Sequence, residues 1–143
     1  MTKLPLYKVI SVGNVQKFED LLLKEAEQEK RVGKPGPWLK ALTTYARQHE
    51  VISQEPHPDY TIPPGEQVFK IIEKNSGRSD LYRWGFQGGA TGNHRIIYAI
   101  HNFSQVILLH YFNKDYNGAI KSADIVPAEK CYEEYCATDP SLY

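Results

Sequence analysis

Basic side chains recur along three neighbouring segments in the second half of the chain. Arg83 lies in DLYRWGFQ, Arg95 lies in HRIIYAIH, and Lys114 follows QVILLHYF closely. Guanidinium and ammonium groups that meet on one surface bind phosphate through charge-assisted hydrogen bonds and stabilise charge that develops during phosphoryl transfer. The pattern therefore predicts a phosphate-handling surface, provided that the fold brings these side chains together.

The preceding segment, VFKIIEK, adds Lys70 and Lys74 on one strand face, where they would bind RNA. A simpler interpretation is that each arginine lies near a strand end, extends into water and pairs with Asp80, Glu73 or the acidic C-terminal segment. Both interpretations stay open at the level of sequence. Convergence of the head groups in one cleft would favour the phosphate surface.

Other side chains near these positions suit supporting roles. His110 lies near the end of its segment and could move a proton, although a hydrogen-bonded core histidine is also consistent with its position. Tyr82 could assist in the same way, and Tyr116 could assist or stack on RNA bases. The histidines lack the spacing of metal ligands, and GGATGN is typical of a turn rather than of a nucleotide-binding loop. No metal and no cofactor are therefore expected.

The charge is balanced overall but not locally. Lys plus Arg equals Asp plus Glu, so the net charge is zero and general basicity gives no argument for nucleic-acid binding. Residues 67–118 hold six basic against three acidic residues, whereas residues 119–143 hold two against five. The basic excess coincides with the predicted strands, although an ordinary solvated sheet face is a comparable explanation.

The length of 143 residues suits a single domain spanning 1–143 with one real core. The chain has no apolar run long enough to span a membrane and no signal-peptide pattern at its start, which predicts a soluble cytoplasmic protein without a membrane partner. Cys131 and Cys136 are five apart in a predicted helix and would point in different directions, so no disulfide between them is expected.

Periodicity predicts a strand over residues 6–12 and then a helix that Asn14 caps and that runs to about Arg31. A second helix begins at Pro37 and continues toward His49, and residues 50–66 form a long proline-rich loop. Strands follow over residues 68–74, 80–87, 94–101 and 105–112. The last helix starts after Asp124, with Pro127 in its first turn.

This order predicts an α+β fold with a small antiparallel or mixed sheet, an N-terminal helical hairpin and a C-terminal helix, the helices lying on one sheet face. Strict alternation places Tyr82, Trp84 and Phe86 on a buried face and Arg83 on the opposite one. It also places His110 on the same face as Val106, Leu108 and Phe112.

The succession LY, a charged strand, a glycine-rich turn, HRIIYAI, VILLHYFNK and the closing ADIVPAEKCYEEY resembles the HigB-like branch of the RelE/ParE toxin superfamily over about residues 68–136. The resemblance implies a RelE-like microbial ribonuclease sandwich. It further implies the toxin of a toxin–antitoxin pair, which cleaves messenger RNA on the ribosome by attack of a ribose 2′-hydroxyl on the adjacent phosphate. An antitoxin, often a helix-turn-helix protein, would cover it.

The resemblance carries over to particular positions. Arg95 matches the arginine of the family's Tyr-Arg-x-x-Tyr strand, with His94 in place of its first tyrosine, and Lys114 matches the first lysine of Phe-x-Lys-Lys. Further matches with the family pattern are Tyr82, His110 and Phe112.

Two positions depart from the pattern: Gly85 stands where the family has a strand arginine, and Asp115 replaces the second lysine. Arg83, two residues earlier on the same face, could replace the missing group. A catalytically degenerate protein that binds a partner, and a ParE-like gyrase poison, are the alternatives.

Overall fold

The computed structural model describes residues 6–59, 61, 67–72, 80–118 and 120–142. The elements follow the predicted order of a strand, two helices, four strands and a helix. In chain order they are β1 (Lys8–Ser11), α1 (Asn14–Arg31), α2 (Pro37–Gln54), β2 (Phe69–Ile71), β3 (Tyr82–Gln87), the short 3-10 helix η2 (Gly89–Thr91), β4 (Asn93–His101), β5 (Gln105–Asn113) and α3 (Ser122–Thr138). The predicted α+β class is confirmed.

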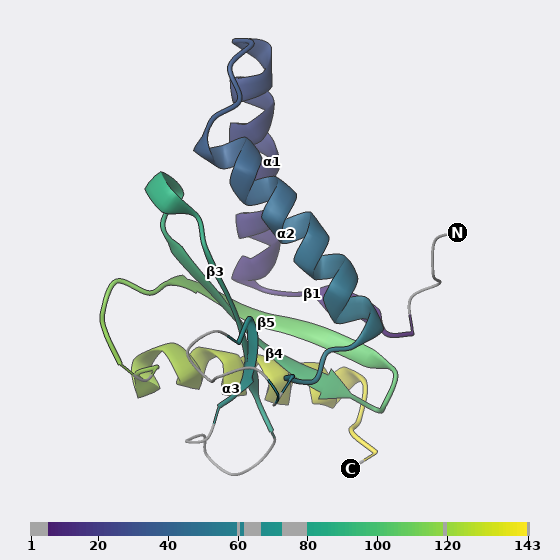
Figure 1. The fold of residues 1–143 in the computed structure, drawn as a ribbon. Helices are drawn as coiled ribbons and strands as arrows, with labels where there is room; N and C mark the ends of the chain where they lie inside the picture. The colour runs from purple at the N-terminus through teal and green to yellow at the C-terminus, as the bar shows by residue number, and fades with distance from the viewer. Residues whose placement is uncertain (1–5, 60, 62–66, 73–79, 119, 143) are drawn as a thin grey trace.

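The strands form one mixed sheet in the order β1-β5-β4-β3-β2 (Figure 1). The pairs from β2 to β5 are antiparallel, as the short connections predict, and only β1 runs parallel to its neighbour β5. Asn102 and Phe103 both have positive φ, of 52° and 62°, in the tight turn between β4 and β5. Positive φ at two successive central residues is typical of a type I′ turn, whose twist matches that of the flanking strands.

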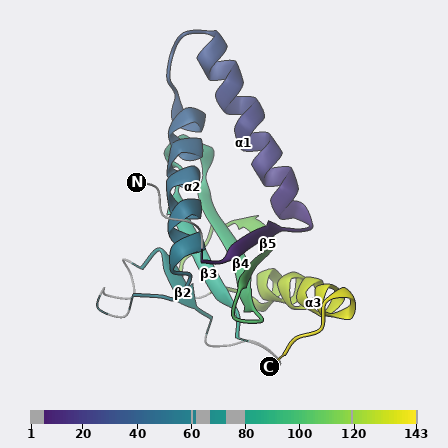
Figure 2. The same cartoon turned by 90° about the vertical axis from the view of Figure 1, so that its right-hand side faces the viewer.

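Helices cover both faces of the sheet. Figures 1 and 2 show the α1–α2 hairpin on one side and α3 on the other. One core cluster joins Phe18 and Tyr45 to Trp84, and a second joins Ala128 of α3 to Ile97. The prediction that all helices lie on one face is therefore wrong. Because β4 and β5 are apolar on both sides, each face needs its own cover.

The pairing of β4 with β5 contains a bulge. Tyr98 pairs with Leu108 and Ile97 pairs with His110, so Leu109 is an extra residue on β5. Val106 and Leu108 face α1 and α2, whereas Phe112 belongs to the cluster under α3. The predicted alternation through β5 is therefore wrong beyond Leu109, and His110 moves to the α3 face.

The helix ends differ from the expectations in three details. Asn14 is the first residue of α1 rather than its cap, and its side chain exchanges hydrogen bonds of 2.7 and 2.8 Å with the backbone of Tyr111 on β5. Helix α2 continues to Gln54, beyond its predicted end. Helix α3 begins at Ser122, so Pro127 lies inside the helix and not in its first turn.

Helix α3 is tied to the sheet by a buried histidine. The Nδ1 of His101, at the end of β4, lies 2.8 Å from the hydroxyl of Tyr132, and its Nε2 lies 3.3 Å from the carboxylate of Asp139. His101 is fully buried, and such a polar side chain needs these partners. Its role is to fix the C-terminal end of α3.

The chain after α2 also returns to the sheet, since the buried Tyr98 hydroxyl donates a hydrogen bond of 2.5 Å to the Pro56 carbonyl.

Residues 60 and 62–66 of the predicted loop, and the predicted RNA-binding Lys74, lie outside the described residues. Cys131 and Cys136 are free thiols, as predicted. Across the described ranges, no helix combines the length and apolarity needed to cross a membrane.

Candidate functional site

Four basic side chains come together on the α3 side of the sheet; they are called here the basic cluster and comprise Lys70, Arg83, Arg95 and Lys114. Lys70 and Arg83 are direct cross-strand partners on β2 and β3, and Arg95 is opposite Gly85 on the next strand pair. Burial lowers the pKa of the Lys114 ammonium, and the charges of Arg95, Arg83 and Lys70 lower it further. Three strands thus contribute one cation each, and Lys114 directly follows the end of β5.

Gly85 is the reason why the two arginines can meet. A Cβ atom at this position would lie 2.7 Å from Nη1 of Arg83 and 2.9 Å from both Cζ and Nε of Arg95. Two groups that are each under 3 Å from one point are less than about 6 Å apart. The guanidinium groups therefore occupy the space that any larger residue at position 85 would fill.

Backbone carbonyls hold Arg83 in place. Its Nη1 donates hydrogen bonds of 3.0 Å to the Gln67 carbonyl and 3.3 Å to the Val68 carbonyl, which precede β2. Burial, with a further contribution from the charge of Arg95, lowers the pKa of Arg83 to about 10. The side chain remains a cation at neutral pH, and its position is fixed before any ligand binds.

Arg95 is held by its own strand. Its Nη1 donates to the Asn93 side-chain oxygen at 2.6 Å and to the His94 carbonyl at 2.9 Å. Burial lowers its pKa as well, while the nearby Tyr116 raises it. Both arginines are half-buried, so each keeps part of its surface accessible to a ligand.

The basic cluster has no carboxylate partner in the described part of the chain, where none of its four head groups forms an ion pair within 4 Å. The ion pairs found among those residues lie elsewhere, for example between Arg31 and Glu27. The interpretation in which Asp80 or the C-terminal helix neutralises the arginines is therefore not supported, and Glu73, its third candidate, lies outside the described residues. Gathered cations without a counter-charge are typical of an anion-binding site, because a bound anion relieves their repulsion.

The bulge at Leu109 brings His110 to this face. Its ring stacks on that of Phe112, with centroids 6.0 Å apart, and Phe112 is the cross-strand partner of Arg95. Burial lowers the pKa of His110, although Asp124 opposes this shift. At neutral pH the half-buried imidazole is therefore uncharged, and an uncharged imidazole can accept a proton.

Tyr116 lies in the connection between β5 and α3. Its hydroxyl donates to the Asp124 carboxylate and accepts a hydrogen bond of 3.1 Å from the backbone N–H of Lys121. The ammonium groups of Lys114 and Lys121 lie 5.4 and 4.5 Å from its ring centroid. Burial, followed by the hydrogen bond to Asp124, raises the pKa of the hydroxyl. The ring thus contacts two ammonium groups, one of which belongs to the basic cluster, while its hydroxyl stays protonated.

The structure separates two other residues from this group. Tyr82 lies on the opposite face, where its ring stacks on that of Tyr98 with centroids 5.4 Å apart. His94 is buried beside α1, and its Nδ1 lies 2.7 Å from the Tyr111 hydroxyl. Burial and the charge of Arg95 lower the pKa of His94 to about 4. In the described ranges, no three histidine, cysteine or acidic residues are grouped so that they could hold a metal.

A pocket that the sequence did not indicate adjoins the two arginines; it is called here the edge pocket. Its volume is about 300 Å³, and it is lined by Thr44, Gln48, Gln67, Val68, Arg83, Gly85, Phe86, Gln87 and Arg95. The amide oxygen of Gln48 accepts a hydrogen bond of 2.7 Å from the Trp84 indole. No pattern in α2 distinguishes Gln48 from other polar helix residues, which is why it was missed.

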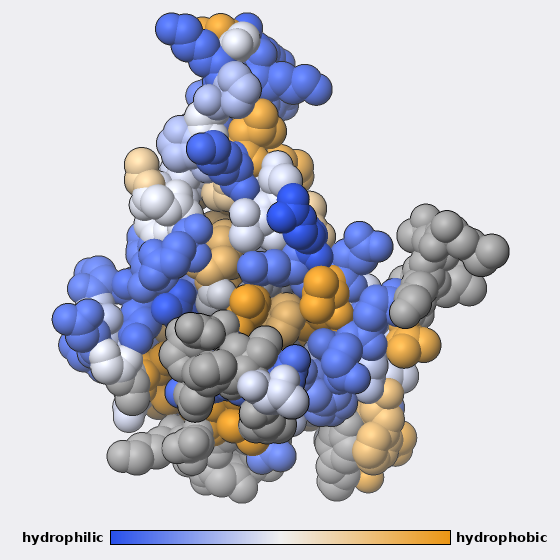
Figure 3. Space-filling view, in the orientation of Figure 1, coloured by the Kyte–Doolittle hydropathy of each residue, from blue (hydrophilic) through white to orange (hydrophobic). Residues whose placement is uncertain are grey.

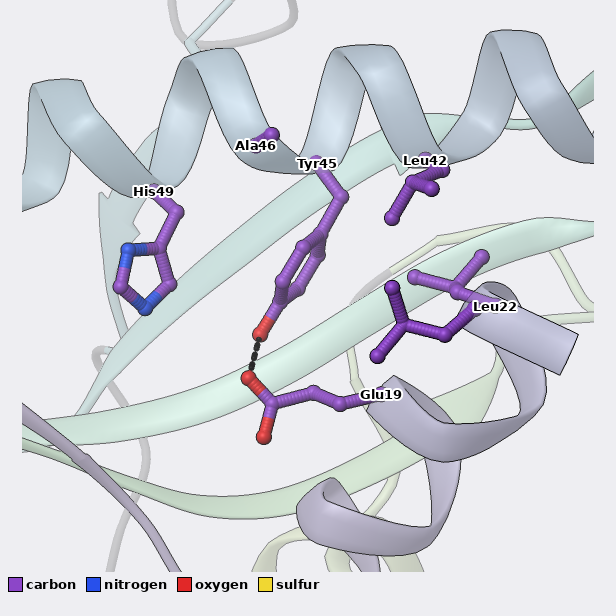
Figure 4. A pocket seen from close by; sticks show the side chains of 7 residues that line it. Glu19, Leu22, Leu42, Tyr45, Ala46 and His49 are labelled. Carbon is purple, nitrogen blue, oxygen red and sulfur yellow. Dashed lines mark hydrogen bonds between the residues drawn. The ribbon is translucent and has the colours of Figure 1, made fainter. Parts of the chain in front are cut away.

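A second cavity of about 300 Å³ lies between α1 and α2 (Figure 4). Its walls are mainly apolar, with Leu22 and Leu42 among them. Tyr45 of α2 and Glu19 of α1 point toward each other, and the hydroxyl donates to the carboxylate at 2.5 Å. Burial raises the pKa of Tyr45, and the bond to Glu19 adds to this effect. This cavity has no cationic side chain in its lining and is distinct from the basic cluster.

Figure 3 shows mainly hydrophilic side chains on the flank where β5 passes into α3.

Comparison of the chain with protein-family models, with curated proteins and with solved structures gives no match. The fold class is therefore established by the structure itself, while the resemblance to RelE-like toxins rests on the sequence motifs alone and stays a prediction.

Proposed function

We propose that this protein is a RelE-like endoribonuclease, the toxin of a toxin–antitoxin pair, which cuts messenger RNA on the ribosome in the cytoplasm. The observation that carries the proposal is the meeting of Arg83 and Arg95 over Gly85, with Lys70 and Lys114 beside them and no described carboxylate to neutralise them. Planar guanidinium groups bind the oxygens of a phosphodiester in pairs, and ammonium groups add charge.

The reaction requires little beyond placement and charge. The ribose 2′-hydroxyl attacks the adjacent phosphorus, the bond from phosphorus to the next 5′-oxygen breaks, and a cyclic 2′,3′-phosphate remains. Negative charge grows on the non-bridging oxygens in the transition state, where Arg83 and Arg95 stabilise it. Because the groups are fixed in advance by Gln67, Val68 and Asn93, little reorganisation accompanies the reaction.

His110 is the candidate acceptor for the proton of the 2′-hydroxyl. Its pKa is lowered by burial, so the imidazole is free to accept a proton at neutral pH. The departing 5′-oxygen takes a proton from solvent. Tyr82, on the other face, has no part in this scheme, and Tyr116 acts through the lysines that its ring contacts.

The proposed partners are a ribosome and an antitoxin. The net charge is zero, so the protein lacks the general attraction to nucleic acid that a basic domain has. A ribosome that presents messenger RNA would supply the missing affinity by placing the phosphate next to the basic cluster. An antitoxin of the helix-turn-helix type would hold the protein inactive between episodes of growth arrest.

The test is to induce the wild-type protein and Arg95→Ala in cells and to map messenger RNA ends. Wild type should arrest growth and create new 5′ ends, and Arg95→Ala should do neither. Arg47→Ala provides the matched control, because Arg47 is an exposed arginine of α2 outside the basic cluster. Intact transcripts with the wild-type protein, or equal cleavage by Arg95→Ala, would overturn the proposal.

A second candidate is a degenerate member of the family whose basic cluster binds an acidic partner protein without cleavage. Part of the donor capacity of the cluster is already used, since the Lys114 ammonium donates to the Gly118 carbonyl and Arg95 donates to Asn93. This candidate predicts growth effects that persist without any new RNA ends.

A further inference from the structure

The edge pocket lies where the edge of the sheet passes from β2 to β3. Among the described residues, strand β2 pairs with β3 from Phe69 to Ile71, opposite Trp84 to Tyr82, and the backbone N–H of Gly85 also reaches the Val68 carbonyl. Strand β3 then continues to Gln87 without β2 beside it. The pocket occupies this step and is bounded by α2 on one side and by the two arginines on the other.

Gln48, Arg83 and Arg95 bring hydrogen-bond donors to the pocket, and the Gln67 and Val68 carbonyls in its lining already accept hydrogen bonds from Arg83. An indole N–H only donates, so the bond from Trp84 identifies the Gln48 oxygen as acceptor and leaves the Gln48 amide nitrogen as donor. Arg83 and Arg95 have donors only. Gln87 is exposed and can present either group, and no carboxylate is among the residues that line the pocket.

We infer that the edge pocket binds the nucleobase next to the reacting phosphate and prefers guanine. This inference rests on the proposed function. The Hoogsteen edge of guanine presents two adjacent acceptors, N7 and O6, which match donors on Gln48 and an arginine. Adenine presents an amino donor in place of O6, and cytosine also presents an amino donor. In either base this amino group would face the donors of Gln48 and the arginines without an acceptor.

Size and wall chemistry agree with this ligand. A volume of about 300 Å³ corresponds to the space of roughly ten water molecules in the liquid, which accommodates a flat purine ring. Phe86 and the bare backbone of Gly85 give the ring an apolar surface. Because Arg83 and Arg95 belong to both the pocket and the basic cluster, the base and its phosphate are held by one connected set of side chains.

The direct test measures binding of GMP, AMP, UMP, CMP and inorganic phosphate to the full chain by calorimetry. GMP should bind at least about fivefold more tightly than AMP, which is the lower end of what one paired base contact gives. Inorganic phosphate should bind more weakly than GMP. Equal affinity for GMP and AMP would overturn the base pocket whether or not the protein cuts RNA.

The matched variant is Gln48→Glu. It keeps an oxygen to accept the Trp84 N–H and replaces the free donor with an acceptor, so the ratio of GMP to AMP affinity should fall to about one. Gln28→Glu makes the same change of charge on the exposed side of α1 and should leave the ratio unchanged. Thr44→Val, on the same wall, is a second variant if Gln48→Glu folds poorly, and it should lower GMP affinity less.

Cleavage of ribosome-bound messenger RNAs that differ only at one base separates the two proposals. Cleavage that favours guanine next to the cut supports both. Cleavage that is indifferent to the base overturns the pocket but keeps the nuclease, whereas selective GMP binding without any cleavage keeps the pocket and overturns the nuclease.

Discussion

The two faces of the sheet use the same strands for opposite purposes. On the α1–α2 face, Trp84, Phe86 and Tyr98 form a continuous aromatic layer with Tyr45, whose ring stacks on Trp84 at 4.8 Å between centroids. On the α3 face, apolar packing under the helix gives way to the basic cluster. The comparison shows that successive residues of one strand can contribute core stability on one face and like charges on the other.

The difference is visible within β3. Trp84 is fully buried, and its indole nitrogen donates to Gln48, whereas its neighbour Arg83 belongs to the basic cluster on the opposite face. Burial of large aromatic side chains contributes several kcal/mol each. That contribution offsets the repulsion among cations that the opposite face holds close together.

The largest effect should come from breaking the aromatic face. Trp84→Ala should lower the free energy of unfolding by about 3–5 kcal/mol, because it leaves a cavity in the core and an unpaired Gln48. Urea unfolding followed by circular dichroism measures this value. A loss below about 1 kcal/mol would mean that the aromatic layer is not the main source of stability.

The second effect concerns the buried His94 on the same face. Its pKa falls from an ordinary 6.5 to about 4 in the folded state, so the folded state favours the neutral imidazole. Below about pH 6.5 the unfolded state takes up a proton that the folded state does not, and stability is lost as pH falls from about 6.5 to about 4. The shift corresponds to about 3 kcal/mol. Urea unfolding at pH 7 and pH 4.5 measures the loss, and His94→Phe should flatten it. An unchanged pH slope in His94→Phe would assign the dependence to other groups.

A smaller change in stability but a large change in function is expected for Gly85→Ala. The added Cβ would crowd Arg83 and Arg95, whose head groups can move aside, so stability should fall by only about 1 kcal/mol. RNA cleavage should fall at least about tenfold, since both guanidinium groups lose their position.

The double variant Gly85→Ala with Arg83→Ala supplies the control. Removing one crowded head group should recover the stability lost in Gly85→Ala, and the non-additivity of the two changes reports their contact. Additive stability effects would show that the glycine and the arginine are independent.

The smallest effect on stability should come from Lys114→Met on the charged face. This side chain repels its neighbours, so its loss should change the free energy of unfolding by less than about 1 kcal/mol in either direction. RNA cleavage should nevertheless fall. A loss of stability comparable to that of Trp84→Ala would contradict the contrast between the faces.

Much of the fold follows from local patterns. Period-two alternation separated Trp84 and Phe86 from Arg83, and proline and glycine marked the break between the first two helices. These predictions succeed because strand alternation and helix ends depend on near neighbours in the chain. The position of α3 was not predictable in this way, since apolar residues on both sides of β4 allow cover from either.

The sequence by itself determined the order of elements, the α+β class and the presence of a basic excess among the strands. Tertiary structure alone decided that the cations meet. Leu108 and Leu109 are both apolar, so no pattern reveals the bulge that moves His110 to the face of the sheet that carries the arginines. In the sequence, Gly85 is only a departure from the expected strand arginine, whereas in the structure it leaves the space in which two guanidinium groups lie. Such a role depends on atoms from neighbouring strands, which a reading of one strand does not contain.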